Sequence, residues 1–158
     1  MKKAFFISDF HFGIAGTESS KEREKLFLKW INEYKPQMSA LYVVGDLFDF
    51  WFEYKMVVPK GGVRILAALA DLQDGGIPVL FFSGNHDQWM FDYFENELGI
   101  PVYHEQNEKT ILGKGLLFNM GEYEIPTTNK NKILGAYPNY PYNDLKVDGF
   151  LSKTQTEG

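Results

Sequence analysis

Three unbroken apolar runs punctuate the first hundred residues, at Lys3–Ser8, Ala40–Val44 and Pro78–Phe82. Short runs of this kind predict strands that are covered on both faces of a sheet. A polar turn and then a segment with helical periodicity follow each run. This alternation predicts an α/β fold in which a mostly parallel β-sheet is layered with helices.

The first helical segment has a capping box, Ser19 with Glu22, at its expected start, and Pro36 at its expected end. The spacing of its apolar residues predicts one buried face. That face comprises Leu26, Phe27, Trp30, Ile31 and Tyr34.

The second helix is expected from about Gly62 to Leu72, where Asp74-Gly75-Gly76 stops it. The third is expected to begin near Asp87 and to end at Gly99, a residue suited to the left-handed conformation that follows a helix. Its predicted core residues are Phe91, Phe94 and Leu98.

Polar residues stand at the same place in all three repeats: Asp9, Asp46 and Asn85 each follow a strand. The carboxyl ends of parallel strands lie along one edge of a sheet, where such folds bind their ligands. We therefore expect these three oxygen donors to converge on one crevice.

The motifs at these positions are Asp9-Phe10-His11, Gly45-Asp46-Leu47-Phe48-Asp49 and Gly84-Asn85-His86-Asp87. Each has an ordinary structural alternative: a solvated turn, a helix cap formed by Asp46 or Asp49, or an Asx turn. Their coincidence at matching strand ends favours a metal site, in which one Asp46 carboxylate can bridge two cations. The chain has no cysteine, so histidine, carboxylate and amide ligands must serve.

In this order and at these intervals, the motifs resemble those of the calcineurin-like metallophosphoesterases, an α/β/β/α sandwich family. The flanking residues are most similar to the UDP-2,3-diacylglucosamine hydrolases of lipid A biosynthesis. The runs that carry this narrower resemblance are Ser8–Gly13, Gly45–Tyr54 and Phe82–Met90, within about residues 2–114. Some of these hydrolases carry arginine where His86 stands.

The resemblance implies that Asp9 and His11 bind the first of two divalent metal ions, Asn85 binds the second, and Asp46 bridges them. The expected metal is Mn²⁺. His86 would sit beside the scissile phosphate, oriented by Asp49. The implied reaction cleaves the pyrophosphate of UDP-2,3-diacylglucosamine, giving UMP and 2,3-diacylglucosamine 1-phosphate.

Composition narrows the possible partners. A formal net charge of −5 argues against non-specific nucleic-acid binding, and no apolar stretch reaches the roughly 20 residues needed to span a bilayer. We expect a cytoplasmic protein, with peripheral contact to the inner membrane left open. The aromatic run Phe48–Tyr54 can line an acyl-chain groove or touch a membrane, but packing beneath the site is the favoured interpretation.

The pattern departs from the family after about residue 114. The family's later histidines, in G-H-G-D and G-H-x-H motifs, have no match, and His104 fits neither. We therefore divide the chain into a metallophosphoesterase part, 1–114, and an atypical, irregular tail, 115–158. Leu116–Phe118 can begin another strand.

Three explanations of this departure stay open. We favour a truncated product or a shifted reading frame; the others are a reduced homologue with ligands from Glu122 or Glu124, and an inactive relative that serves as a binding module. With ligands missing, we expect little or no activity from the 158-residue form. A phosphodiesterase or phosphatase for another phosphoester is the alternative enzyme.

Overall fold

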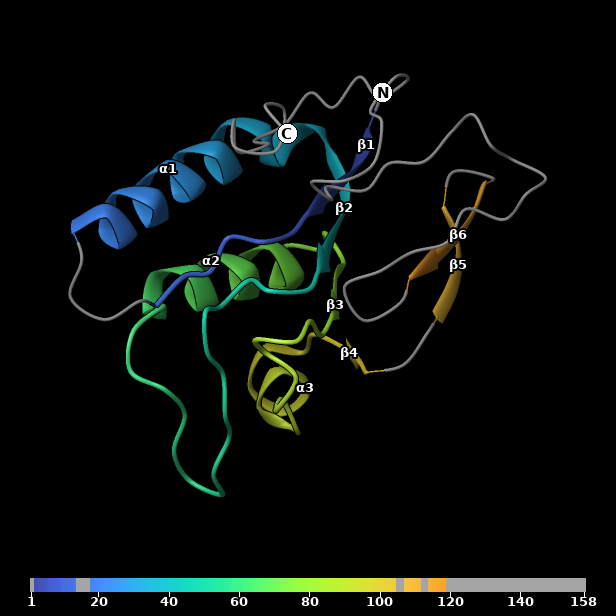
Figure 1. Ribbon diagram of the computed structural model, residues 1–158. Coiled ribbons are helices and arrows are strands. Elements are labelled where there is room, and N and C mark those ends of the chain that lie inside the picture. Colours follow the sequence, from blue (N-terminus) through green and yellow to red (C-terminus); the bar gives the residue numbers. More distant parts are fainter. Residues whose placement is uncertain (1, 14–17, 105–106, 112–113, 119–158) are drawn as a thin grey trace, which may run out of the picture.

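The computed structural model describes residues 2–13, 18–104, 107–111 and 114–118 (Figure 1). Its helices are α1 (Glu18–Tyr34), η1 (Lys35–Gln37, a short 3₁₀ helix), α2 (Val63–Asp74) and α3 (Tyr93–Leu98). Its strands are β1 (Lys3–Ile7), β2 (Met38–Val44), β3 (Val79–Phe82), β4 (Val102–Tyr103), β5 (Asn107–Ile111) and β6 (Lys114–Phe118).

The predicted parallel sheet is confirmed. Strands β1 to β4 lie in chain order, and each pairs in parallel with the next. The three predicted strands match β1, β2 and β3 to within two residues at each end. All four strands consequently point their carboxyl ends to the same edge.

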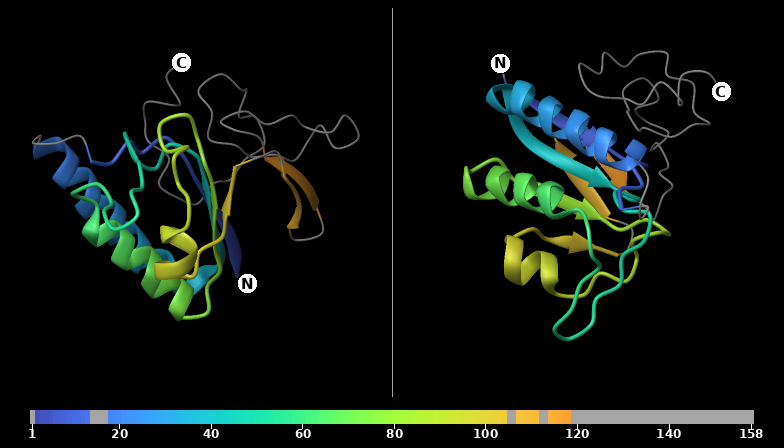
Figure 2. Two further views of the ribbon diagram at one scale, coloured as in Figure 1. Left: turned by 90° about the horizontal axis from the view of Figure 1, so that it is seen from below. Right: turned by 90° about the vertical axis from the view of Figure 1, so that its left-hand side faces the viewer.

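Helices α1, α2 and α3 cover one face of this sheet, as the two views of Figure 2 show. The main core lies between them because alternate strand residues, such as Phe5, Leu41 and Phe81, point toward the helices. Fully buried helix residues meet them, among them Phe27, Leu69 and Phe94. The core thereby fixes the strand ends from which the polar loops begin.

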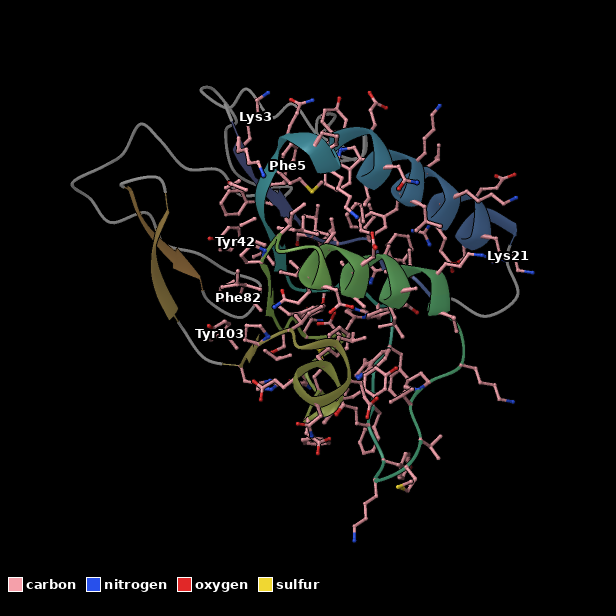
Figure 3. All side chains as sticks on the ribbon, turned by 180° about the vertical axis from the view of Figure 1, so that it is seen from behind. Lys3, Phe5, Lys21, Tyr42, Phe82 and Tyr103 are labelled. Carbon is pink, nitrogen blue, oxygen red and sulfur yellow. The ribbon has the colours of Figure 1, made fainter. Side chains whose placement is uncertain are left out.

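The opposite face of the sheet carries a second, smaller apolar cluster. Tyr42, Phe82 and Tyr103 lie on this side, away from the helices and from Phe5 (Figure 3). The antiparallel hairpin of β5 and β6 also lies on this side of the sheet. Strand β6 includes Leu116–Phe118, where the sequence predicts a further strand, and residues 119–158 of the predicted irregular tail lie outside the described residues.

The prediction for the first helix is right about its existence and its end, but wrong in two details. The helix begins at Glu18, which places Ser19 inside its first turn rather than at the cap. Leu26 is 50% exposed because it lies at the edge of the apolar stripe, whose centre is formed by Phe27 and Ile31. The second helix agrees closely, beginning after Gly62 and ending before Gly75.

The prediction for the third helix is wrong at its start. Helix α3 begins at Tyr93 rather than near Asp87, although it ends at Gly99 as expected. Asp87 is fully buried and its carboxylate accepts backbone hydrogen bonds within the preceding loop, so this segment does not coil into a helix. Phe91, predicted to be in the core, is therefore outside the helix and 61% exposed.

Among the helices that the structure describes, none combines the length and the apolar character required to cross a bilayer.

Candidate metal centre

The loop after β1 alternates core residues with site residues. Phe10 and Phe12 are buried and stack with ring centroids 5.1 Å apart, and both contact Phe27 of α1. The intervening Asp9 and His11 have φ angles of 57° and 48°. These left-handed conformations are unusual for residues other than glycine, and strained backbones of this kind cluster at active and ligand-binding sites.

The loop after β2 brings Asp46 to the same edge. Asp46 also has a left-handed backbone, with φ of 51°, and is only 5% exposed. Backbone bonds extend the sheet pairing into both loops: His11 donates to the Asp46 carbonyl at 3.0 Å, and Phe12 donates to the Leu47 carbonyl at 2.8 Å. Three of the predicted site residues, Asp9, His11 and Asp46, are thus the three non-glycine residues of the described chain with positive φ.

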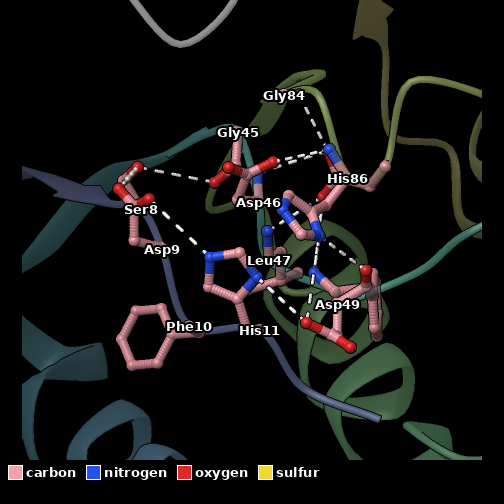
Figure 4. Close-up of polar contacts among 12 residues, drawn as sticks. Ser8, Asp9, Phe10, His11, Gly45, Asp46, Leu47, Asp49, Gly84 and His86 are labelled. Carbon is pink, nitrogen blue, oxygen red and sulfur yellow. Dashed lines mark hydrogen bonds and ion pairs between the residues drawn. The ribbon is translucent and has the colours of Figure 1, made fainter. Parts of the chain in front are cut away.

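Glycines allow the loops after β2 and β3 to touch backbone to backbone. A Cβ added to Gly84 would lie 2.2 Å from Oδ1 of Asp46, and one added to Gly45 would lie 3.0 Å from the Gly84 Cα. Across this contact, the His86 backbone N–H donates to Asp46 Oδ1 at 2.9 Å (Figure 4). The close approach explains why glycine precedes both Asp46 and Asn85.

Asp9, His11 and Asp46 form one cluster of candidate ligands. Each offers an atom within 4.8 Å of the others, and His11 Nε2 lies 3.9 Å from Asp9 Oδ1. A cation at roughly 2 Å from each ligand atom requires spacings of this order. Of the three oxygen donors expected to converge, Asp9 and Asp46 lie together in this cluster, with His11 beside them.

His11, Asp49 and His86 form a second cluster beside the first. Asp49 Oδ1 lies 3.4 Å from His11 Nδ1 and 3.8 Å from His86 Nδ1, and the two imidazole rings meet edge to face at 4.6 Å. The His86 Nδ1–H donates to the Asp49 carbonyl oxygen at 2.9 Å, which leaves Nε2 for another partner. Asp49 therefore holds the His86 ring through its backbone carbonyl, and its carboxylate lies near the same nitrogen.

Asn85 lies in the loop after β3, between Gly84 and His86, with an exposed side chain. Its position after the third strand is the one that the sequence predicts. His104 follows β4 at the same edge, and its Nδ1 lies 3.1 Å from Ser83 Oγ.

The carboxylates at this edge of the sheet favour the binding of a cation. Burial raises the pKa of the Asp9 carboxyl, and the nearby Asp46 raises it further, while a hydrogen bond from Ser8 opposes both. Within the described ranges, no lysine or arginine forms an ion pair with Asp9, Asp46 or Asp49. A divalent cation would neutralise this concentration of carboxylates.

The imidazole of His11 supports the same conclusion. Its Nδ1 atom is buried and, among the residues that the structure describes, forms no hydrogen bond, since the 3.4 Å approach to Asp49 lacks hydrogen-bond geometry. The Nε2 atom faces Asp9. A donor set of carboxylates, imidazole and amide suits divalent ions such as Mn²⁺ or Mg²⁺, so the residues present fit a metal centre.

Sequence reasoning missed three residues that hold these loops. Arg23 of α1 donates to the Phe10 and His11 carbonyls at 2.9 and 3.3 Å. Asp87 and Glu53 are buried carboxylates that accept backbone hydrogen bonds, and burial raises the pKa of Asp87 to about 6. The sequence placed Asp87 at the end of the third motif and Glu53 within the run Phe48–Tyr54, but gave no sign of what either carboxylate binds.

The exposed imidazole of His86 has its pKa raised. The largest cause is the hydrogen bond to the Asp49 carbonyl, and the charges of Asp46, Asp49 and Asp87 add to it. The partial desolvation of the ring acts in the opposite direction. The environment therefore favours the protonated imidazolium, which can donate a proton from Nε2.

The chain is similar to proteins of a known family. The family model for calcineurin-like phosphoesterases matches residues 2–155. A UDP-2,3-diacylglucosamine hydrolase from Porphyromonas gingivalis is 35% identical over 129 residues, which cover 82% of this chain and 49% of that protein. A hydrolase of the same name from Histophilus somni is 31% identical, and the match covers 77% of this chain and 50% of that protein. One from Stenotrophomonas maltophilia is also 31% identical, and the match covers 74% of this chain and 45% of that protein.

The chain spans about half the length of these curated relatives. The matched part includes the whole parallel sheet and all three motifs at its carboxyl edge. On the family match and on the geometry of this edge, the chain belongs to the calcineurin-like phosphoesterase family.

Proposed function

We propose that this chain contributes the metal edge of a two-metal phosphoesterase that hydrolyses the pyrophosphate of UDP-2,3-diacylglucosamine, giving UMP and 2,3-diacylglucosamine 1-phosphate. The observation that carries the proposal is the convergence of Asp9, His11 and Asp46 within 4.8 Å at the carboxyl edge of the sheet. The names of the relatives supply the substrate.

In this proposal Asp9 and His11 would hold one ion, Asn85 would hold the other, and Asp46 would contribute a ligand to both. When bound, two divalent ions such as Mn²⁺ neutralise phosphate charge and lower the pKa of a bound water. Hydrogen bonds from the Ser8 hydroxyl to Asp9 Oδ2 and from the His86 N–H to Asp46 Oδ1 hold these carboxylates in place before a metal binds, which lowers the cost of ordering them.

His86 is proposed to act on the scissile phosphate. Its Nδ1–H is held by the Asp49 carbonyl, so Nε2 is the atom directed to a ligand. Water adds to one phosphorus of the pyrophosphate and gives up a proton to solvent, the bridging P–O bond breaks, and the departing oxygen takes a proton. The raised pKa of the His86 imidazole suits it to supply that proton.

The acylated part of the substrate requires an apolar surface near the site. Aromatic side chains from the loops after β2 and β3 gather beside it, with Trp89 in ring contact with Phe50 and Phe52 at 6.3 and 6.2 Å. We call this set the aromatic surface: Phe50, Phe52, Tyr54, Trp89 and Phe91. The run Phe48–Tyr54 is thus divided, because Phe48 and Trp51 pack in the core while Phe50 and Tyr54 are exposed.

We propose that the aromatic surface faces the inner leaflet of the inner membrane, from the cytoplasm. Met56 and Val57, at the tip of the same loop, are 92% and 62% exposed, and the exposed Lys55 and Lys60 flank them. Apolar side chains with neighbouring lysines bind anionic bilayers by insertion and by charge attraction.

Vesicle binding tests the membrane contact. Trp89 is 39% exposed, whereas Trp30 and Trp51 are 6% and 1% exposed, so a blue shift of tryptophan fluorescence reports on Trp89. We expect the shift with phosphatidylglycerol vesicles and a weaker one with phosphatidylcholine. Phe50→Ser should reduce binding, and Leu26→Ser, which alters an exposed apolar residue on α1, should not; equal effects would contradict the proposal.

Metal and substrate assays test the reaction. We expect calorimetry to detect Mn²⁺ binding by the wild-type chain and little by Asp46→Asn. Any Mn²⁺-dependent UMP release from UDP-2,3-diacylglucosamine should exceed that of Asp46→Asn. Cleavage of an aryl phosphodiester alone would indicate a different phosphoester substrate, and absence of Mn²⁺ binding would contradict a metal centre.

A further inference from the structure

Two buried carboxylates join the loops on either side of the metal edge. We call residues 45–62 the β2 loop and residues 83–92 the β3 loop. Asp87 belongs to the β3 loop and is 0% exposed; Glu53 belongs to the β2 loop and is 6% exposed. Each carboxylate reaches into the opposite loop and accepts hydrogen bonds from its backbone or from the residue that follows it.

Asp87 binds the start of the β2 loop. Its Oδ2 accepts from the Leu47 N–H at 2.9 Å, and its Oδ1 accepts from the Asp46 N–H at 3.2 Å. The same Oδ1 accepts from Gly84 in its own loop at 2.7 Å. This carboxylate therefore holds the backbone of Asp46 against the β3 loop.

Glu53 binds the other end of the β3 loop. Its Oε2 accepts from the N–H groups of Phe91, Asp92 and Tyr93 at 2.8, 2.9 and 3.1 Å. Its Oε1 accepts from the indole Nε1–H of Trp51 at 2.9 Å, and Trp51 is itself 1% exposed. All four of these contacts use N–H donors, so the ionised carboxylate is matched to its surroundings.

Between these two carboxylates, backbone hydrogen bonds also connect the β2 loop to the β3 loop. Trp51 donates to the His86 carbonyl at 3.3 Å, and Glu53 donates to the Trp89 carbonyl at 3.2 Å. The β3 loop is thus fixed to the β2 loop at both ends and in the middle. Asp46 lies on one loop, and Asn85 and His86 lie on the other, so their separation depends on this connection.

We infer that Glu53 is a positioning residue for the metal centre: by binding the backbone of residues 91–93, it holds the β3 loop so that Asn85 and His86 keep their places relative to Asp46. The inference rests on the proposed function of this edge. A role confined to stabilising α3 would leave the metal site unaffected when Glu53 is changed.

Mn²⁺ calorimetry and hydrogen exchange test the inference on the full chain. Glu53→Gln places an amide NH₂ where N–H donors surround the carboxylate. We expect Mn²⁺ affinity to fall roughly 10-fold to 100-fold, as when ligand-supporting residues are lost in other sites. Exchange at the amides of Asp46 and Leu47, which Asp87 binds, should become faster.

Leu72→Ala is the matched control. Leu72 is fully buried at the end of α2, next to the start of β3 and at the opposite end of the strands from the site. It should lower the unfolding temperature at least as much as Glu53→Gln, yet change the Mn²⁺ affinity by no more than about two-fold. Both proteins are compared at a temperature where circular dichroism shows them folded.

A second variant separates the competing results. In Glu53→Gln the new amide NH₂ faces the indole N–H of Trp51, so two donors meet. Trp51→Phe removes the indole N–H, so the double variant Trp51→Phe/Glu53→Gln should recover part of the Mn²⁺ affinity. If Glu53→Gln does not fold, Glu53→Asp keeps the charge, shortens the reach, and should show the same loss of affinity.

The inference is overturned if faster exchange is confined to residues 91–93 and the affinity matches that of the Leu72→Ala control. Absence of Mn²⁺ binding by the wild type would instead remove the proposed function, and the exchange data would still decide whether Glu53 holds the loop of Asp46.

Discussion

Asp46 Oδ1 accepts a hydrogen bond from the His86 backbone N–H at 2.9 Å, across the closest approach of the two loops. This bond uses one lone pair of the carboxylate that we propose as the bridge between two metal ions. The bond also fixes the orientation of the carboxylate. Asp46 is only 5% exposed and has a left-handed backbone, so it has little room to move.

Substitution of Asp46 should abolish metal-dependent stabilisation. A ligand at 100 times its dissociation constant stabilises a protein by about 2.7 kcal/mol. For a chain of this size, that corresponds to a rise of about 5–10 °C in the unfolding temperature. We expect Mn²⁺ to produce a rise of this order in the wild type and almost none in Asp46→Asn, measured by differential scanning fluorimetry.

The control for that experiment is Asp71→Asn. Asp71 is an exposed carboxylate on α2 that pairs with Lys35, away from the site. It should retain the full Mn²⁺ response. Loss of the response in both variants would show that the effect arises from net charge rather than from the site.

Gly84→Ala should disrupt the contact between the loops. The added Cβ would lie 2.2 Å from Asp46 Oδ1 and 2.6 Å from the Asp46 backbone nitrogen, so one loop must move. We expect a loss of about 1–3 kcal/mol in the free energy of unfolding, typical of overpacking, together with a loss of Mn²⁺ binding. Denaturant titration with and without Mn²⁺ measures both.

Gly76→Ala provides the comparison. Gly76 has a φ of 80° and nothing within 4 Å of an added Cβ, so it reports backbone strain without a clash. We expect it to lower stability by about 1 kcal/mol and to leave Mn²⁺ binding intact. A Gly84→Ala variant that still binds Mn²⁺ normally would show that the site tolerates a displaced β3 loop.

Arg23→Met should loosen the first motif. The Arg23 guanidinium holds the carbonyls of Phe10 and His11, which fixes the left-handed turn between Asp9 and His11. Hydrogen bonds to charged groups contribute roughly 1.5–3 kcal/mol, and partial exposure of Arg23 reduces this, so we expect a loss of about 1–2 kcal/mol. Denaturant titration should show this loss, while Lys29→Met on the exposed side of α1 should change stability by less than about 0.5 kcal/mol.

The sequence predicts the parallel sheet and the edge that carries Asp9 and Asp46 because the signals for both are local. Unbroken apolar runs identify the strands, parallel topology follows from the intervening helices, and together they place Asp9 and Asp46 at one edge. None of this requires knowledge of long-range contacts. The same reasoning correctly ended α2 and α3 at glycine residues.

The sequence does not reveal what holds the site together. Asp87 and Glu53 stand within the runs that carry the resemblance, but their roles appear only in the structure, where distant backbone N–H groups surround them. The predicted third helix began too early for the same reason. The pattern from residue 87 is helical, but the buried Asp87 carboxylate binds backbone N–H groups, which keeps this segment in a loop. Tertiary hydrogen bonds of this kind override local propensity.

The two histidines of the edge should respond differently to substitution. His11 belongs to both ligand clusters and has a buried Nδ1 atom, whereas the His86 ring is exposed and bound to the Asp49 carbonyl. His86→Ala removes the imidazole but keeps the backbone N–H that binds Asp46 Oδ1, so the proposed bridge remains oriented. We therefore expect Mn²⁺ to stabilise His86→Ala nearly as much as the wild type, and to stabilise His11→Ala much less. Thermal unfolding with increasing Mn²⁺ makes the comparison, and an equal loss in both variants would mean that the His86 ring is itself a metal ligand, with the ion held by the cluster of His11, Asp49 and His86.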